Sequence, residues 1–339
     1  MRQSLCLLAG CLASFGTAVP TNGNDGSPKV TDVDILNYAL TLEYLERKFY
    51  VEGLKKYTMQ DFTKAGFTTD FYSKLQDIRR DEEAHVKFLS GALGEKAIKE
   101  PTFAFPHKDA KSFVGLAGVL EGVGVSAYLG AAPSISNKQY LGAAGSILTV
   151  EARHASYVRA ALRQKPFPLP NDTPLDFNQV FSLAAQFVKS FAAGTKTPFK
   201  PFPALTVTPN QSGKVCAGKT ALTLITKSKG KDQNADKKLY AVFYSGLETY
   251  YVPLKGSNMQ YTCSVPGANF SKQGQEAPAG QVYVTISSAD GKSTKANDGN
   301  TVAGVGILEV ENCDQKMTGT KEEGEEEGEE KGEEKGEEK

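Results

Sequence analysis

Two short stretches decide the fold of this 339-residue chain: RDEEAH at residues 80–85 and VEARH at residues 150–154. Each places a Glu three residues before a His, so on a helix both side chains leave the same face. The whole sequence has three histidines, and two of them stand in this arrangement. The third, His107, follows a proline in a predicted loop, and we expect it to be a surface residue. With 13 Glu in the first 320 residues, chance would put a Glu at both positions roughly once in several hundred sequences. Such a pair is typical of a four-helix bundle that holds two metal ions and takes one more Glu from each of its other two helices.

Hydrophobic periodicity supplies those two other helices. Apolar residues recur at steps of three and four, so we expect four helices, at residues 34–50, 69–92, 109–131 and 137–163. Between the second and the third, Pro101 and Pro106 predict a connection at 95–109 without regular structure. The first begins near Thr31, which is a good N-cap, and turns both Glu43 and Glu46 to its inward face. The third is rich in Gly, and the single acid of its apolar run is Glu121. Each of the four helices therefore carries an acid on the face that the pattern predicts to be buried.

The predicted metal ligands follow from these faces: Glu43, Glu82, His85, Glu121, Glu151 and His154. A carboxylate on a buried face is costly unless it is paired or bound to metal, and two histidines cannot neutralise four acids. Two divalent cations would balance them, and carboxylate with imidazole suits both iron and manganese. The competing interpretation is that some of these residues are exposed. We prefer Glu43 to Glu46 as the ligand of the first helix, with Glu46 as an alternative ligand or a support to the others. We expect Tyr50 and Tyr128 to pack in the core, with a hydrogen bond to a metal ligand or the transfer of an electron as the alternatives.

The pattern changes near residue 200. A predicted fifth helix at Phe177–Phe191 closes the bundle, a Pro-rich linker follows, and period-two segments then predict about seven short strands, which is typical of an immunoglobulin-type β-sandwich. The expected fold class is therefore α+β with two domains. We expect the helical bundle at 31–195, the linker at 196–203, the sandwich at 204–314 and a disordered acidic tail at 315–339.

The N-terminus has the features of a secretory signal peptide. A basic start at Met1-Arg2 precedes an apolar core at Leu5–Ala13, and small residues precede a cleavage point near Ala18. The apolar core is too short to span a bilayer, and we expect no later stretch to be long and apolar enough to span one. The hydrophilic C-terminus does not fit a lipid-anchor signal. We therefore expect a signal peptide at 1–18, a flexible start at 19–30, and a secreted protein without a membrane anchor.

Cysteines and glycosylation sequons agree with secretion. Three cysteines remain after signal cleavage, Cys216, Cys263 and Cys313, and the simplest account is one disulfide and one free thiol, with all three pairings open. Glycosylation sequons begin at Asn210 and Asn269. We expect a glycoprotein of the extracellular space, with a cell-wall association as one option.

Charge is spread unevenly although the net charge is zero. Residues 321–339 hold 11 Glu and 4 Lys, a net charge of −7, which leaves +7 on the rest of the chain. The lysines outside the tail are scattered and form no basic motif, so we expect no nucleic-acid partner.

Three segments of the helical part, 37–50, 120–133 and 144–155, resemble the ferritin-like family that includes fungal stress-response and sexual-development proteins and plant desiccation-related proteins. The resemblance covers about residues 30–190 and implies a ferritin-like four-helix bundle. By analogy with rubrerythrins, bacterioferritins and manganese catalases, it also implies the ligands chosen above. Members are known mostly through induction by stress, desiccation or development. The predicted secretion and the added sandwich differ from storage ferritins, so we do not expect a 24-subunit iron cage.

Three functions are compatible with the sequence. The first is a secreted di-iron or di-manganese oxidoreductase that acts on peroxide, oxygen or ferrous iron, of the peroxidase, catalase or ferroxidase type. In it, Glu43 and Glu121 are terminal or bridging ligands, and each Glu-x-x-His pair gives one Glu and one His to one metal. The second is a non-catalytic stress or cell-wall protein whose sandwich binds wall glycan or protein. The third is a hydroxylase or desaturase, which would need an apolar channel beside the metals.

Overall fold

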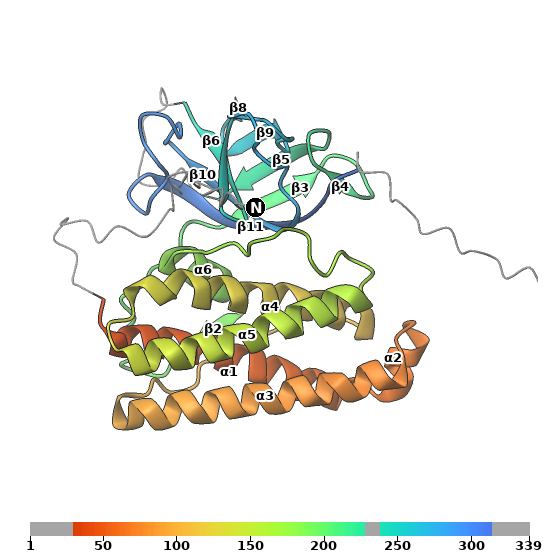
Figure 1. Cartoon of the computed structure of the whole chain (residues 1–339), viewed down its shortest axis with the longest axis vertical. Helices are drawn as coiled ribbons and strands as arrows, with labels where there is room; N and C mark the ends of the chain where they lie inside the picture. The colour runs from red at the N-terminus through yellow and green to blue at the C-terminus, as the bar shows by residue number, and fades with distance from the viewer. Residues whose placement is uncertain (1–29, 228–237, 314–339) are drawn as a thin grey trace, which may run out of the picture.

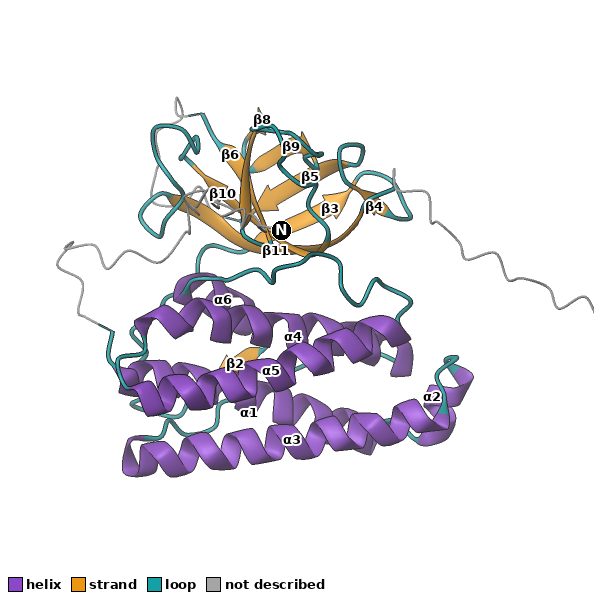
Figure 2. Cartoon of the chain, in the orientation of Figure 1, coloured by secondary structure: helices purple, strands orange, loops and turns teal. Residues whose placement is uncertain are grey.

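The molecule has a helical half and a β half that lie against each other, as Figures 1 and 2 show. The structure is a computed structural model and describes residues 30–227 and 238–313. The predicted signal peptide, nearly all of the predicted flexible start and the acidic tail lie outside the described residues. The helices of the described part are α1 (Asp32–Lys56), α2 (Met59–Lys64), α3 (Thr69–Leu93), α4 (Ala110–Ala131), α5 (Lys138–Ala161) and α6 (Phe177–Ala184), with short 3-10 turns at Gly94–Lys96 and Ala132–Ser134.

Capping residues fix where the long helices begin. Thr31 is the N-cap of α1, as predicted: its hydroxyl accepts the Asp34 N–H, and the Asp34 carboxylate accepts the Thr31 N–H at 2.9 Å. Asp109 and Ser112 form the same reciprocal pair at the start of α4. These bonds satisfy backbone donors that the first helical turn leaves free, and each cap is worth about 1 kcal/mol. The four predicted long helices are confirmed.

The bundle is built from two helix pairs, α1 with α3 and α4 with α5. Aromatic residues fill the end of the bundle near α2, where the rings of Phe49 and Phe113 stack at 4.4 Å and Phe62 meets Phe113 edge to face. All three side chains are fully buried, and each contributes about 1.5–3 kcal/mol by leaving water. This packing holds α1 and α4 side by side at a fixed spacing, which positions the acids further along the same helices.

The most apolar of the described helices is α4. Together with its 3-10 extension, at Ala110–Ser134, it is long and apolar enough to cross a membrane, with a mean hydropathy of 1.5. The expectation that no segment after the signal peptide is apolar enough to span is wrong on that measure. However, 72% of this apolar window is buried inside the protein. The composition of α4 is thus that of the core helix of a bundle.

Two expectations for the irregular regions are wrong. The fifth helix ends at Ala184, and residues Val188–Ser190 form strand β2, which pairs antiparallel with β1 (Thr102–Phe103) in the connection predicted to lack regular structure. The Ala104 N–H also donates to the Phe187 carbonyl at 2.8 Å. Pairing between distant segments therefore overrides the helical pattern of residues 185–191. The short helix α2 was not predicted, although Thr58 and Asp61 form a capping box there.

The β half is a two-sheet sandwich, which confirms the predicted class. Its strands in the described part are β3 (Leu205–Pro209), β4 (Val215–Cys216), β5 (Ala221–Thr226), β6 (Tyr240–Ser245), β7 (Glu248–Pro253), β8 (Lys255–Ser257), β9 (Gln260–Ser264), β10 (Gly280–Ser287) and β11 (Thr301–Glu311). One sheet has the order β4-β11-β10-β6-β7 and the other β3-β5-β9-β8, the arrangement of an immunoglobulin-type sandwich. The seven predicted strands are present, while β4 and β8 are additional short ones.

One disulfide closes the edge of the larger sheet. Cys216 at the end of β4 is bonded to Cys313, just after β11, with a Cα–Cα distance of 5.5 Å. Cys263 in β9 is the free cysteine of the described part, and burial raises the pKa of its thiol to about 12. The structure thus selects one of the three pairings that the sequence left open.

The two halves share a buried interface. Tyr283 of β10 is 1% exposed and belongs to the hydrophobic core of the bundle. Its hydroxyl donates to the Gly122 carbonyl of α4 at 2.8 Å and lies 2.8 Å from the Ser126 hydroxyl. Arg159 of α5 forms a two-pronged ion pair with Glu309 of β11, at 2.6 and 2.9 Å. The sandwich is therefore packed firmly against the helices.

Candidate metal centre

The structure brings all six sequence-predicted ligands together at the middle of the bundle. They lie on the inward faces of α1, α3, α4 and α5, which the buried apolar residues of the same faces turn toward the core. The four glutamates are 0% exposed, and the two histidines are 9% and 7% exposed. The ligand set is Glu43, Glu82, His85, Glu121, Glu151 and His154.

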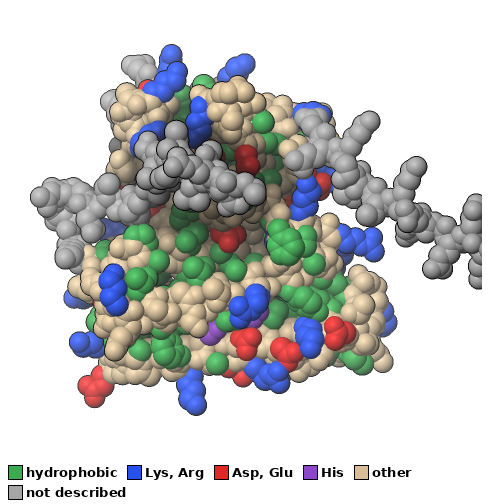
Figure 3. Space-filling view, in the orientation of Figure 1, with side chains coloured by type: hydrophobic (Ala, Val, Ile, Leu, Met, Phe, Trp, Pro, Cys, Tyr) green, Lys and Arg blue, Asp and Glu red, His purple; other side chains and the backbone are tan. Residues whose placement is uncertain are grey.

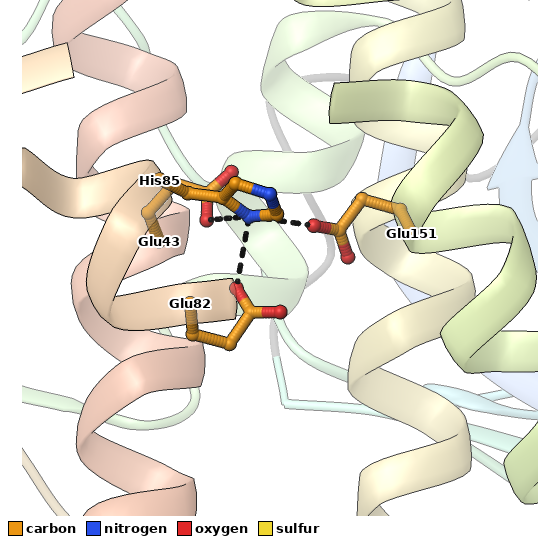
Figure 4. Close-up of side chains that lie close together, drawn as sticks. All are labelled: Glu43, Glu82, His85 and Glu151. Carbon is orange, nitrogen blue, oxygen red and sulfur yellow. Dashed lines mark hydrogen bonds and ion pairs between the residues drawn. The ribbon is translucent and has the colours of Figure 1, made fainter. Parts of the chain in front are cut away.

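The first group of ligand atoms surrounds the His85 ring. Its Nδ1 lies 3.2 Å from Glu43 Oε2, 3.2 Å from Glu151 Oε1 and 3.4 Å from Glu82 Oε2, as Figure 4 shows. The three carboxylates come from α1, α5 and α3 and converge on one nitrogen. A single ring N–H cannot satisfy three carboxylates, whereas one cation among these four atoms could bind them all.

The second group surrounds His154. Its Nδ1 lies 3.2 Å from Glu82 Oε1 and 3.3 Å from Glu121 Oε2. Ligand atoms of Glu82, Glu121, Glu151 and His154 all lie within 4.8 Å of one another, as do those of the first group. Glu82 and Glu151 therefore belong to both groups, with Glu43 and Glu121 at the outer ends. The sequence left Glu43 and Glu121 open as terminal or bridging ligands, and their positions at the outer ends favour the terminal role. Glu82 and Glu151, each expected to serve one metal, are instead the two residues that could contact both ions.

Unsatisfied polar atoms at this site fit bound metal. Both carboxylate oxygens of Glu82 and of Glu151, one oxygen of Glu121 and Nδ1 of His154 are buried without a hydrogen-bond partner. A buried polar atom without a partner costs about 1–3 kcal/mol, and more if it is charged. Such a concentration of unsatisfied donor atoms in one place is what two cation sites with oxygen and nitrogen ligands require. The donor set can hold a metal pair, and either iron or manganese suits it.

Two tyrosines hold the outer carboxylates. The Tyr50 hydroxyl donates to Glu121 Oε1, and the Tyr128 hydroxyl donates to Glu43 Oε1 at 2.5 Å. Each bond occupies one oxygen of its glutamate and leaves the other, Oε2, facing a histidine. Burial, and then the neighbouring carboxylate, raises the pKa of both hydroxyls well above the ordinary value, so they remain donors. Both rings also pack in the hydrophobic core, as expected, so the structure shows core packing and the hydrogen bond to a glutamate together.

Glu46 lies beside the centre, next to Gly124 of α4. It is 3% exposed, and its Oε2 has no hydrogen-bond partner among the described residues. A Cβ added at Gly124 would lie 2.9 Å from Glu46 Oε1 and 3.1 Å from Glu151 Oε2. Glycine at this position therefore provides the space that both carboxylates occupy. Burial, followed by repulsion from Glu151, raises the pKa of Glu46 well above the ordinary value.

The charges of the metal-free centre are balanced by protons. Burial raises the pKa of Glu82 to about 7, although contacts with His154 and His85 oppose the rise. Burial lowers the pKa of His154, but its contacts with Glu121 and Glu82 outweigh that effect and raise it to about 11. The pKa of His85 is likewise raised by Glu151, Glu43 and Glu82 against the effect of burial. Without metal, both histidines are therefore protonated at neutral pH.

Asp81 was missed by the sequence argument. Its Oδ2 lies 3.2 Å from His154 Nε2, and its side chain is 53% exposed. A carboxylate that accepts a hydrogen bond from the Nε2–H of a histidine keeps the proton on Nε2, so Nδ1 can bind a metal. The signal was present, since Asp81 stands directly before Glu82, but it falls outside the Glu-x-x-His pattern. In Figure 3, histidine atoms reach the surface of the helical half among acidic and basic side chains.

His107, the third histidine, takes no part in the centre. Its Nδ1 lies 2.9 Å from the Tyr57 hydroxyl, and its ring meets those of Phe49 and Phe113 edge to face. The expected plain surface histidine is thus half-buried in the aromatic end of the bundle.

The comparisons with known proteins point to the same domain. A family model described as a ferritin-like domain matches residues 31–164. Protein rds1 of Schizosaccharomyces pombe is 26% identical over 199 residues, which cover 57% of this chain and 50% of the relative. The matched region thus spans about half the length of that curated relative. With the fold and the paired ligand groups, these matches establish that residues 31–164 of this chain are a ferritin-like domain.

Proposed function

We propose that this protein is a secreted di-metal protein that uses iron or manganese to handle peroxide, dioxygen or ferrous iron under stress. The observation that carries the proposal is the pair of ligand groups that share Glu82 and Glu151. Four carboxylates and two neutral imidazoles balance two divalent cations in charge. When bound, such a pair of ions supplies Lewis acidity and redox chemistry to a small oxygen-containing molecule.

The residues around the centre have separate tasks in this proposal. Tyr50 and Tyr128 orient the terminal carboxylates through their hydroxyls. Asp81 holds the proton on Nε2 of His154 and is open to solvent, so it can also pass a proton to or from the surface. Gly124 leaves room for the Glu151 and Glu46 carboxylates. Each task can be tested by a substitution that leaves the ligands in place.

The space beside the centre favours a small substrate. An apolar cavity of about 20 Å³ lies next to the centre. Each of the four helices contributes to its wall a residue within two turns of a metal ligand: Ala39, Leu89, Tyr128 and Ile147. That volume holds roughly one water-sized molecule, and an apolar wall gives water no partners. Dioxygen fits such a space in size and polarity, whereas the organic substrate of a hydroxylase or desaturase does not fit in size.

Secretion and glycosylation remain part of the proposal. The Cys216–Cys313 disulfide supports an oxidising compartment, and the sequon residues Asn210 and Asn269 are exposed. In this proposal the sandwich binds a wall glycan or a protein partner.

The test is a set of three assays on protein loaded with iron or with manganese: peroxide consumption, oxygen consumption and ferrous-iron oxidation. We expect turnover in at least one assay and its loss in Glu82→Ala/Glu151→Ala. The matched control is Glu83→Ala, which should keep the activity. Glu83 is exposed and forms an ion pair with Arg79 at 3.9 Å. If the wild type binds two ions but shows no turnover in any assay, the metals are structural and the non-catalytic alternative is favoured.

A further inference from the structure

A second, larger cavity lies on the other side of α1 from the metal centre. Its volume is about 300 Å³, which is within the range of sites for small organic ligands. One wall is the outer face of α1, another is the segment 96–99 after α3, and the third is the segment 193–199 after β2. None of the predicted site residues lines this cavity.

The floor of the cavity is apolar and largely aromatic. It includes Tyr38, Leu42, Phe181 and Phe199, which are all buried. The Phe199 ring meets the Tyr38 ring edge to face at 5.4 Å and stacks on Phe177 at 4.8 Å. These contacts hold the floor in place without a ligand, so a flat apolar group could bind there with little rearrangement.

Hydrogen bonds also hold the walls in place. The Asn37 side chain donates to the Lys96 carbonyl at 2.9 Å and accepts from the Ile98 N–H at 2.7 Å. The Thr41 hydroxyl donates to the Asn37 carbonyl, and the Thr197 hydroxyl donates to the Phe199 carbonyl. These bonds fix the shape of the cavity. Because the polar groups of the wall already have partners, the charges that attract a polar ligand must belong to other residues.

Three exposed lysines supply that attraction. Lys96, Lys99 and Lys196 line the cavity, and none of them forms an ion pair with another described residue. The lining contains one acid, Asp34, whose Oδ2 is engaged by the Thr31 backbone and hydroxyl at 2.9 and 2.6 Å. The lining therefore carries a net charge of +2, at the rim of an apolar floor.

We propose that this cavity binds a small amphipathic anion, namely an aromatic carboxylate whose ring lies on the Tyr38 and Phe199 floor and whose charge faces the three lysines. Aromatic residues favour a flat ring in offset or edge-to-face contact. An anion at the rim keeps part of its hydration while it gains three cationic neighbours. The inference is independent of the metal-dependent function, because no metal ligand lines the cavity.

Calorimetric titration of the full-length protein tests the proposal, with naphthalene carboxylate as the probe and its neutral carboxamide as the isosteric control. We expect the carboxylate to bind more tightly than the carboxamide. The variant Lys96→Gln/Lys99→Gln/Lys196→Gln should weaken carboxylate binding by roughly tenfold and leave the carboxamide unchanged. Ala193→Trp, at an exposed position of the wall, should abolish binding of both by filling the cavity.

The control variant removes the same charge elsewhere. Lys55→Gln/Lys64→Gln/Lys87→Gln changes three exposed lysines of the bundle that do not line the cavity, and it should bind both probes as the wild type does. Melting curves show whether each variant is folded, and the lysine variants test the proposal even if the Trp variant does not fold. The proposal is overturned if the wild type does not bind the carboxylate, if it binds both probes equally, or if the two lysine triples weaken binding alike.

Discussion

Gly124 sets the space available to the carboxylates of the metal centre. A methyl group there would press on Glu46 Oε1 and Glu151 Oε2 at 2.9 and 3.1 Å. Alanine is a better helix former than glycine by about 1 kcal/mol, so α4 itself should not be weakened. We expect Gly124→Ala to lower metal affinity by roughly tenfold or more, as changes beside metal ligands do. Competition with a chelator of known affinity measures it.

Gly115→Ala is the matched control for that prediction. It lies in the same helix, and a Cβ added there meets nothing within 4 Å. It should leave metal affinity unchanged and raise the melting temperature slightly. Equal loss of affinity in both variants would show that the effect comes from the helix and not from the space at Gly124.

Metal binding should release protons and strengthen as the pH rises. In the metal-free protein the pKa of Glu82 is about 7 and that of His154 about 11, both above their ordinary values. At pH 7 His154 is therefore protonated and Glu82 is about half protonated, and metal must displace these protons. Affinity should therefore rise by roughly tenfold per pH unit for each proton displaced. Calorimetry in two buffers of different ionisation enthalpy counts the released protons. A pH-independent affinity without proton release would contradict the assignment of these ligands.

At the residue scale, helical spacing explains how much the sequence could predict. Glu82 and His85 share a face because they are three residues apart, and the same holds for Glu151 and His154. That rule selects side chains that converge but does not give distances between helices. The sharing of Glu82 and Glu151 by both ligand groups therefore required the structure.

At the scale of elements, Gly130 allows α4 to contact the chain that leads to α6. A Cβ at Gly130 would lie 1.8 Å from the Leu175 carbonyl oxygen, and the Leu175 N–H donates to the Ser126 carbonyl. Because backbone cannot move aside as a side chain can, we expect Gly130→Ala to destabilise the protein by at least about 2 kcal/mol. Denaturant unfolding measures the change.

The control for this variant is Gly142→Ala in α5, where an added Cβ meets nothing within 4 Å. It should leave the free energy of unfolding unchanged or raise it. If the two variants have the same stability, the close contact of α4 with Leu175 does not exist in solution.

Element ends that depend on local caps were predictable, and those that depend on distant pairing were not. Thr31 marks the start of α1 in the sequence because its partner Asp34 is three residues away. No local signal of this kind marks the end of α6 at Ala184, and the residues after it continue the helical pattern. This end of α6 follows from the pairing of β2 with β1, in which Phe103 is paired with Val188 and Thr102 with Ser190, far apart in the sequence.

At the scale of the whole molecule, the Arg159–Glu309 ion pair joins the two halves. Arg159 is 7% exposed, and Glu309→Ala would leave it without its carboxylate. Removing one partner of a buried pair is costly, but the Glu309 side chain is 32% exposed, so we expect a loss of about 2 kcal/mol. Thermal unfolding measures the loss. We expect the wild type to unfold in one transition and the variant to unfold in two, one for each half.

Glu311→Ala is the control on the same strand. Glu311 pairs with Lys214 at 2.6 Å, but both side chains are exposed, so the loss should be below about 0.5 kcal/mol. An equal effect of the two variants would mean that the interface pair does not join the halves.

The docking of the sandwich on the bundle could not be predicted from the sequence. The period-two pattern identifies which strand residues are buried, but it does not say whether they face the other sheet or another domain. Tyr283 reads as an ordinary strand residue, yet its ring lies in the core of the bundle and its hydroxyl bonds to α4. The sandwich is thus a structural support of the helix that carries Glu121.

The central claim is a pair of metal ions bridged by Glu82 and Glu151, and metal stoichiometry with X-ray absorption tests it most directly. Full-length protein reconstituted with iron or manganese should contain two ions per chain, with a metal–metal distance of about 3.5–4 Å. Glu82→Ala/Glu151→Ala should lose both ions, and Glu83→Ala should keep them. Protein without bound metal after reconstitution with either ion, or with single ions that have no metal neighbour, would contradict the account.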